Sequence, residues 1–248
     1  GAAHLSALRD DGQVAGVNIL YEDNHLLVAE KPAGVPAQAD ASGAADMLTL
    51  LKAYLKEKYQ KSGAVYLGLV HRLDRPASGL MGFARASKAA SRLSEQIRQG
   101  RMQKGYFTVV QGAPPREGRL EDYLVKDPRK NQSRIARPGE RGAKKAALEY
   151  EVLQQKSGQA LVRVRLLTGR PHQIRLQFAS RGWPLVGDAK YGSGGQDLAL
   201  YSYFLGFAHP TKKQAMRFYS LPSAPAFAPF AQAMRQAINA QKKAAAEL

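Results

Sequence analysis

Short apolar runs separated by turn residues recur along the chain and predict a strand-rich protein. Runs 17–21 and 26–30 flank the polar segment 22–25, a pattern typical of a β-hairpin. The same pattern predicts further strands at 66–70, 80–84, 104–112, 147–153 and 160–167. In the run 160–167, valine and leucine alternate with arginine, so we expect one buried face and one wet, cationic face.

A different spacing predicts the helices. Leu48, Leu51, Leu55 and Tyr59 form one apolar stripe at i, i+3, i+7 and i+11, which predicts a helix over 46–60.

Three more helices follow from capping signals and composition. Ser87 and Thr168 are predicted N-caps of helices that end near Gln99 and Arg181, and an Ala-rich segment after Pro229 predicts a last short helix.

The chain has no internal repeat and no clear interior linker. We therefore predict one domain over 17–248, preceded by a loose lead-in at 1–16. Because the chain opens on Gly1 rather than Met, we expect a processed or trimmed N-terminus and allow for a missing upstream domain.

Charge narrows the class of partner. The sequence holds 37 Lys and Arg against 20 Asp and Glu, a formal net charge of +17. Such an excess favours a polyanion, and the spread of basic residues over the whole chain favours nucleic acid over a membrane surface. No apolar run approaches the roughly 20 residues that span a bilayer. We expect a cytoplasmic protein that does not bind membranes.

The residue types that are missing exclude several kinds of site. The chain has no cysteine, which excludes disulfides, thiolate catalysis and cysteine-bound zinc. No His, Asp or Glu cluster has a convincing metal-ligand spacing, and no dinucleotide-binding fingerprint is present. We expect neither a metal nor a cofactor.

The segment 126–147 is the most basic part of the chain. It holds eight Lys or Arg and two acidic residues, and its prolines and glycines prevent a long helix. We interpret it as an extended or hairpin arm that tracks an RNA backbone; the alternative is a solvated loop.

Two polar stretches carry candidate chemistry. The first, 70–81, lies between two predicted strands and sets Asp74 between Arg72 and Arg75. Its simple alternative is a turn in which Asp74 caps backbone amides. In the second, 168–176, His172 and Arg175 are three apart and share a helix face; the alternative is a surface helix with incidental charges.

Both stretches resemble signatures of the RluA-type pseudouridine synthases. Residues 71–74 (His-Arg-Leu-Asp) and 78–80 (Ser-Gly-Leu) resemble the catalytic loop of that family, and 168–175 (Thr-Gly-Arg-Pro-His-Gln-Ile-Arg) resembles its second signature. Ala77 and Met81 depart mildly from the family pattern, which has threonine and an aliphatic residue there. Residues 187–192 (Gly-Asp-Ala-Lys-Tyr-Gly) continue the match, and 205–210 resemble the family's late strand, which ends in His-Pro. The resemblance extends over about 17–225.

The resemblance implies the fold. Family members are α+β proteins with a long, bent, mixed and mostly antiparallel sheet around a central cleft, flanked by helices. Many also carry a small N-terminal RNA-binding domain of the S4 type. We expect this fold here, with the chain beginning almost directly at the catalytic domain.

The resemblance also implies the catalytic residues of a uridine isomerase. Asp74 would be the catalytic carboxylate, and Arg175 would pair with it, because a carboxylate in an apolar pocket needs a cation to stay ionised. Tyr106, in the family's Lys-x-Tyr pattern, would stack on the uracil and help to remove the proton from its carbon 5.

The substrate would be a uridine extruded from RNA. Arg72 would reach into the vacated position, while Arg170 and His172 would support the site or touch the backbone. We expect a monomer acting on large-subunit (23S) ribosomal RNA, with transfer RNA as the alternative. Two other classes stay open, an RNA-binding protein without catalysis and a hydrolase or glycosylase that releases the base.

Overall fold

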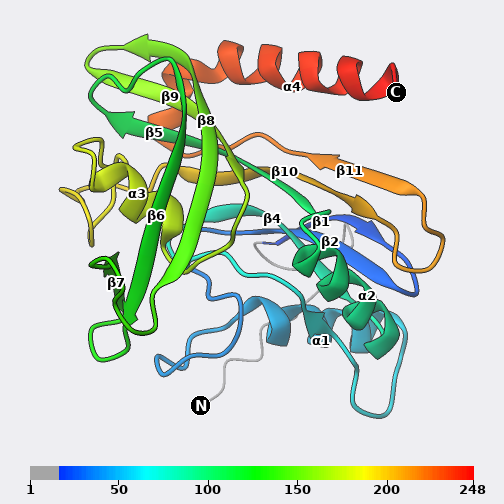
Figure 1. Cartoon of the computed structure of the whole chain (residues 1–248). Helices are drawn as coiled ribbons and strands as arrows, with labels where there is room; N and C mark the ends of the chain where they lie inside the picture. The colour runs from blue at the N-terminus through cyan, green and yellow to red at the C-terminus, as the bar shows by residue number, and fades with distance from the viewer. Residues whose placement is uncertain (1–16) are drawn as a thin grey trace. The chain divides into compact units, whose positions relative to one another are not determined.

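The computed structural model describes residues 17–248, so the predicted lead-in at 1–16 lies outside the described residues. The chain falls into two compact units, which we describe separately (Figure 1). The first unit runs up to Met102 and includes Leu205–Phe218, and the second comprises Gln103–Phe204 and Tyr219–Leu248. The prediction of one domain stays a prediction, since compact units need not be separate domains.

The first unit combines short strands with two helices. Its elements are β1 (Asn18–Glu22), β2 (Leu26–Lys31), α1 (Met47–Lys58), β3 (Gly68–Leu69), β4 (Ser78–Ala84), α2 (Ser87–Arg98), the end of β10 (Leu200–Ala208) and most of β11 (Ala215–Tyr219). The strand order is β1-β2-β4-β10, with β3 also paired to β4 and β11 to β10. The β1–β2, β2–β4 and β3–β4 pairs are antiparallel.

The second unit is built on longer strands. Its elements are β5 (Gln103–Gln111), β6 (Glu117–Asp127), β7 (Gln132–Ile135), β8 (Lys144–Lys156), β9 (Gln159–Leu166), α3 (Gln173–Ala179), the start of β10, a 3₁₀ helix (Pro225–Phe230) and α4 (Ala231–Ala246). The strand order is β10-β5-β9-β8-β6-β7. All four pairs from β5 to β7 are antiparallel, which confirms the α+β class with a large, mostly antiparallel sheet.

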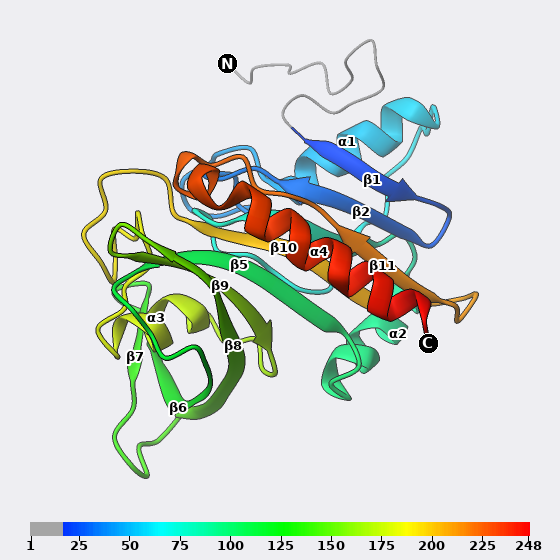
Figure 2. The same cartoon turned by 90° about the horizontal axis from the view of Figure 1, so that it is seen from above.

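Each unit has its own core. In the first, α2 buries Leu93 among Leu26, Leu80 and Phe207 of the strands. In the second, α4 runs along the sheet (Figure 2). Its Met234 and Ile238 share a core with Phe107 and Tyr203, whose rings stack with centroids 3.9 Å apart. Burying each such side chain contributes about 1.5–3 kcal/mol, so these contacts fix which face of the sheet each helix covers.

The first helix differs slightly from its prediction. Asp46 is the N-cap and accepts a bond from the Thr49 amide at 3.1 Å, so the helix begins at Met47. Leu51 and Leu55 are buried as predicted, but Tyr59 is 43% exposed because it lies beyond the last helical residue.

The second helix also starts differently. Ala86, not Ser87, occupies the N-cap position of α2, and its end beside Gly100 agrees with the prediction.

Two strands were not predicted. The charged sequence of β6 masks its alternation, because Leu120 and Leu124 are its only buried residues. β11 has no buried residue.

The basic arm predicted within 126–147 is confirmed as a hairpin, which is formed by the end of β6 and by β7.

Candidate active site

Asp74 lies in the loop between β3 and β4 of the first unit and is half-buried. Its carbonyl accepts a bond from the Ala77 amide at 3.0 Å, which closes a turn. At the start of the loop, His71 Nε2 accepts a bond from the Gly82 amide of β4 at 2.9 Å. Arg72 is exposed. Two hydrogen bonds from backbone amides therefore hold the loop around Asp74, and Arg72 lies in solvent.

Lys31 is a buried cation beside this loop. Its side chain is fully buried, and Nζ donates to the carbonyls of Pro32, Val35 and Arg75 at 3.0, 2.7 and 2.8 Å. An ammonium has three N–H donors, so these three carbonyls satisfy it. Burial lowers the pKa of Lys31 to about 7, against the opposing effect of the negative charge of Asp74. The sequence analysis did not single out Lys31 as a site residue. The available signal was a lysine at the end of an apolar strand.

Arg75 joins the Asp74 loop to the segment 32–42. Its carbonyl accepts bonds from Lys31 Nζ and the Gly34 amide, and its Nε donates back to the Gly34 carbonyl at 2.9 Å. Nη1 donates to Ser42 Oγ at 3.0 Å and pairs with Asp40 at 3.3 Å. These bonds therefore fix Arg75, the residue that follows Asp74.

The helix α3 is shorter than predicted. It begins at Gln173 because His172 has a left-handed backbone, with φ 56°. Thr168 is not its N-cap; the hydroxyl accepts a bond from the Ala147 amide at 2.9 Å and donates to Gln173 Oε1 at 2.7 Å. Arg170 is half-buried, and its Nε donates to the Lys145 carbonyl at 2.9 Å. The segment before α3 is thus bound to β8.

Arg175 lies inside the second unit and pairs with an acid that the sequence analysis did not single out. Nε and Nη2 donate to the two oxygens of Asp188 at 2.9 and 2.8 Å, and both side chains are buried. Burial alone would raise the pKa of Asp188, but the hydrogen bonds and charge of Arg175, with two backbone amides, hold it below its ordinary value.

Tyr191 contacts both His172 and Arg175. Its hydroxyl is 2.7 Å from His172 Nδ1 and accepts a bond from the Ser133 amide at 2.9 Å. The Arg175 guanidinium lies 5.3 Å from the centre of the Tyr191 ring. His172 and Arg175 are therefore joined through Tyr191.

Tyr106 lies on the same sheet face as α3. It is 5% exposed and pairs across the sheet with Val164, which pairs with Tyr150. Paired residues share a sheet face, and the Tyr150 ring contacts Phe178 of α3 at 5.4 Å between centroids.

Lys104, two residues before Tyr106, is on this face as well. A Cβ added at Gly169 would lie 2.8 Å from its Nζ, and burial lowers the pKa of Lys104. Gly169 of the second signature thus leaves room for Lys104 of the Lys-x-Tyr pattern.

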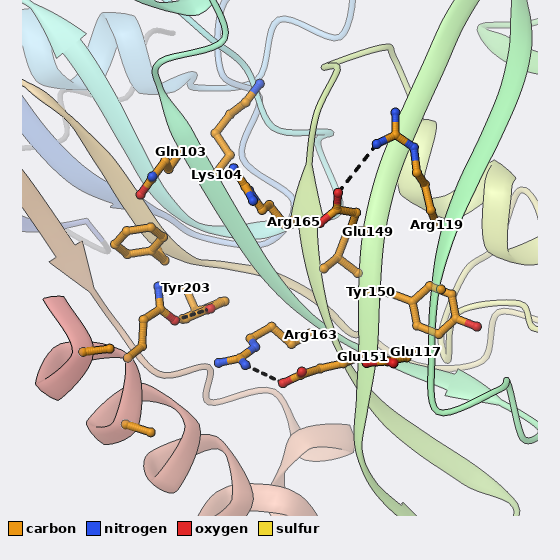
Figure 3. Close-up of a pocket in the computed structure, with 16 residues that line it drawn as sticks. Gln103, Lys104, Glu117, Arg119, Glu149, Tyr150, Glu151, Arg163, Arg165 and Tyr203 are labelled. Carbon is orange, nitrogen blue, oxygen red and sulfur yellow. Dashed lines mark hydrogen bonds and ion pairs between the residues drawn. The ribbon is translucent and has the colours of Figure 1, made fainter.

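A cavity of about 860 Å³ lies in the second unit (Figure 3). Its lining includes Lys104 and Tyr150 but is mostly made of other polar residues: Arg119, Arg163, Arg165, Glu117, Glu149, Glu151, Tyr203 and Gln241. Arg163 forms an ion pair with Glu151, and Arg119 lies 3.7 Å from Glu149. These ion pairs balance charge across neighbouring strands. None of the predicted site residues lines this cavity, so it is not the candidate active site.

The six predicted site residues divide between the units. Asp74 and Arg72 belong to the first unit, and Tyr106, Arg170, His172 and Arg175 to the second. In the part of the chain that the structure describes, no group of three or more His, Asp or Glu residues could hold a metal ion. None of the helices within 17–248 is long and apolar enough to cross a membrane.

Comparison with known proteins agrees with the sequence signatures. The profile of a family described as RNA pseudouridylate synthase matches residues 25–180. An uncharacterized RNA pseudouridine synthase of Aquifex aeolicus is 33% identical over 220 residues, which cover 82% of this chain and 68% of that protein. Ribosomal large subunit pseudouridine synthase D of Neisseria meningitidis serogroup A is 32% identical over 220 residues, covering 82% of this chain and 57% of that protein.

A solved structure shows the same fold. The human RNA pseudouridylate synthase domain containing 4 superposes with a TM-score of 0.69, at 24% sequence identity, over 85% of this chain and 89% of the human chain. At this identity the likeness is evidence for the fold alone.

Proposed function

Because this chain belongs to the RNA pseudouridylate synthase family, we propose that it isomerises specific uridines of RNA to pseudouridine, with Asp74 as the catalytic carboxylate. The observation that carries the proposal is the match over 25–180, a stretch that includes Asp74, Tyr106 and Arg175. The name of the Neisseria relative supports large-subunit ribosomal RNA as the substrate, with transfer RNA as the alternative.

Two cations act on Asp74 in this proposal. Lys31 is the first, since in its protonated form the buried ammonium and the Asp74 carboxylate attract each other within one unit. Arg175 is the second, as the resemblance to the family implies. Within its own unit its guanidinium is held by both oxygens of Asp188.

The reaction needs a carboxylate and a base but no redox step. The bond between N1 of uracil and C1′ of ribose breaks, and a bond between C5 and C1′ forms. C5 loses a proton and N1 gains one, so the product is an isomer. An ionised Asp74 assists the breaking of the first bond, as carboxylates do at anomeric carbons. Tyr106 stacks on the uracil and helps to remove the C5 proton.

RNA binding rests on the basic hairpin and the loop arginine. The hairpin of β6 and β7 contacts the phosphate backbone, to which Arg170 and His172 add support. A stacked uridine must leave its helix to reach the half-buried Asp74 carboxylate, at a cost of about a few kcal/mol. The exposed Arg72, two residues from Asp74, occupies the vacated position.

The test is a product analysis. The protein is incubated with total RNA from a strain that lacks its gene, with EDTA and no cofactor, and the digested nucleosides are examined. We expect pseudouridine from the wild type and none from Asp74→Asn, which still binds RNA. Free uracil would indicate a hydrolase or glycosylase instead. Tight RNA binding without any product would indicate a non-catalytic RNA-binding protein.

A further inference from the structure

The buried ion pair between Arg175 and Asp188 has more hydrogen bonds than a simple charge pair needs. Asp188 is 1% exposed, and its carboxylate accepts four bonds, two from Arg175 and one each from the amides of Lys190 and Tyr191. A planar carboxylate held by two amides fixes the plane of the guanidinium that pairs with both of its oxygens. Asp188 therefore determines both the position and the orientation of Arg175.

The backbone around Asp188 is held in place by its own close contacts and hydrogen bonds. Gly187 has φ +81°, and a Cβ there would lie 2.2 Å from the Asp197 carbonyl oxygen. The Asp188 carbonyl accepts a bond from the Gly194 amide at 3.0 Å. The segment that carries Asp188 is thus closed on itself and has little freedom to move away from Arg175.

Tyr191 connects this ion pair to the basic hairpin. Its amide donates to Asp188, its ring lies against the Arg175 guanidinium, and its hydroxyl accepts the Ser133 amide from β7. The neighbouring Lys190 donates from Nζ to the Asn131 carbonyl at 2.6 Å, at the hairpin turn. The hairpin is therefore bonded to the same short segment that holds Arg175.

We propose that Asp188 and Tyr191 are positioning residues for uridine isomerisation. Asp188 fixes the Arg175 guanidinium, and Tyr191 joins that ion pair to the β6–β7 hairpin, so that one buried cluster holds both the hairpin and the arginine. This inference rests on the proposed function, because it takes Arg175 as the partner of Asp74. It adds residues that lie beyond the stretch matched by the family profile, which ends at 180.

The chain offers a matched control. Asp122 of β6 accepts a bond from Arg181 at 2.7 Å and one from Gln177 of α3 at 2.9 Å. Asp122→Asn weakens an Asp–Arg pair beside the same helix without touching Arg175. Any loss caused only by loosening of α3 appears in this variant too.

The experiment compares Asp188→Asn, Tyr191→Phe and Asp122→Asn with the wild type. Single-turnover rates of pseudouridine formation are measured across pH on the RNA that the wild type modifies, together with RNA dissociation constants. We expect Asp188→Asn to lower the saturated rate by about 10–100-fold, the range for a lost charge-assisted bond. That loss follows because Arg175 is no longer held in one position and orientation. Tyr191→Phe is expected to weaken RNA binding by about 2–10-fold, more than it lowers the rate.

A spectroscopic readout is independent of activity. The arginine Nε–H signals of the labelled protein are recorded, and that of Arg175 is identified by its loss in Arg175→Lys. We expect Asp188→Asn to shift and broaden this signal and Asp122→Asn to leave it unchanged.

The outcomes separate this inference from the proposed function. An unchanged rate and Nε–H signal in Asp188→Asn, or equal losses in Asp188→Asn and Asp122→Asn, would overturn the positioning role. If the wild type makes no pseudouridine, the proposed function fails, and the positioning role falls with it even where the Nε–H signal confirms the ion pair.

Discussion

Buried charges with defined partners shape each unit at the scale of single residues. Lys31 replaces its lost hydration with three carbonyls, one of which belongs to the residue that follows Asp74. Arg175 replaces its hydration with both oxygens of Asp188. Removing one partner of such a group leaves the other buried and unpaired, which costs more than the bond itself is worth.

Lys31 gives a prediction about stability and pH. The unfolded chain keeps its lysine proton up to a pKa near 10.5, whereas burial in the folded state lowers that pKa to about 7. Between these values the unfolded state binds more protons, so the Lys31 contribution to the unfolding free energy rises with pH over that window. We expect the wild type to gain a few kcal/mol relative to Lys31→Met from pH 7 to 10.

Denaturant unfolding at several pH values measures this difference. Lys52→Met, at an exposed position of α1, serves as the control and should run parallel to the wild type. A constant difference between wild type and Lys31→Met over the window would show that Lys31 keeps its proton in the folded state.

At the scale of elements, the segment after α3 is as important as the helix. The helix positions Arg175, but the segment from Gly187 to Tyr191 supplies its acid and its aromatic contact. Because α3 has only seven residues, its place depends on these side-chain bonds more than on its own helical bonds.

Gly187→Ala tests that segment. The added Cβ would clash with the backbone of Asp197 in a conformation that alanine rarely adopts, so we expect a loss of roughly 2–4 kcal/mol in unfolding free energy. Gly195→Ala is the matched control, since Gly195 has a similar φ of +85° and nothing within 4 Å of an added Cβ. The Gly195→Ala variant should lose about 1 kcal/mol of unfolding free energy. Equal losses in the two variants would show that backbone strain alone, not the clash beside Asp188, sets the cost.

The comparison of sequence and structure is clearest in these elements. The signatures predicted Asp74, Tyr106 and Arg175 as site residues because each stands in a short local pattern. Local patterns do not show which distant residue completes a buried group. The family match therefore included Asp188 but not its bonds to Arg175, and the Lys31 contact with Arg75 was not predicted either. The start of α3 was misplaced for the same reason: Thr168, a good cap in sequence, bonds β8 instead.

At the scale of the whole molecule, the net charge of +17 is the dominant property. It supports RNA as the partner but does not identify the contact surface. The hairpin segment and the lysine face of α1 are both basic, and only the first was interpreted as an RNA contact. Their contributions can be separated by the salt dependence of binding.

Neutralising two hairpin charges should reduce that salt dependence. Each contact with a single-stranded phosphate contributes about 0.7 to the slope of log affinity against log salt, so Arg129→Gln with Lys130→Gln should lower the slope by about 1.4. Lys52→Gln with Lys56→Gln on α1 should leave it unchanged. A reduced slope in the α1 pair and not in the hairpin pair would move the RNA to the other surface.

The central claim is that Asp74 carries the isomerisation of uridine. The most direct measurement is tritium release from RNA labelled at carbon 5 of uridine, under single-turnover conditions with the protein in excess. We predict one tritium released for each pseudouridine formed by the wild type, and no release from Asp74→Asn at an unchanged RNA dissociation constant. Release by Asp74→Asn at the wild-type rate would contradict the claim.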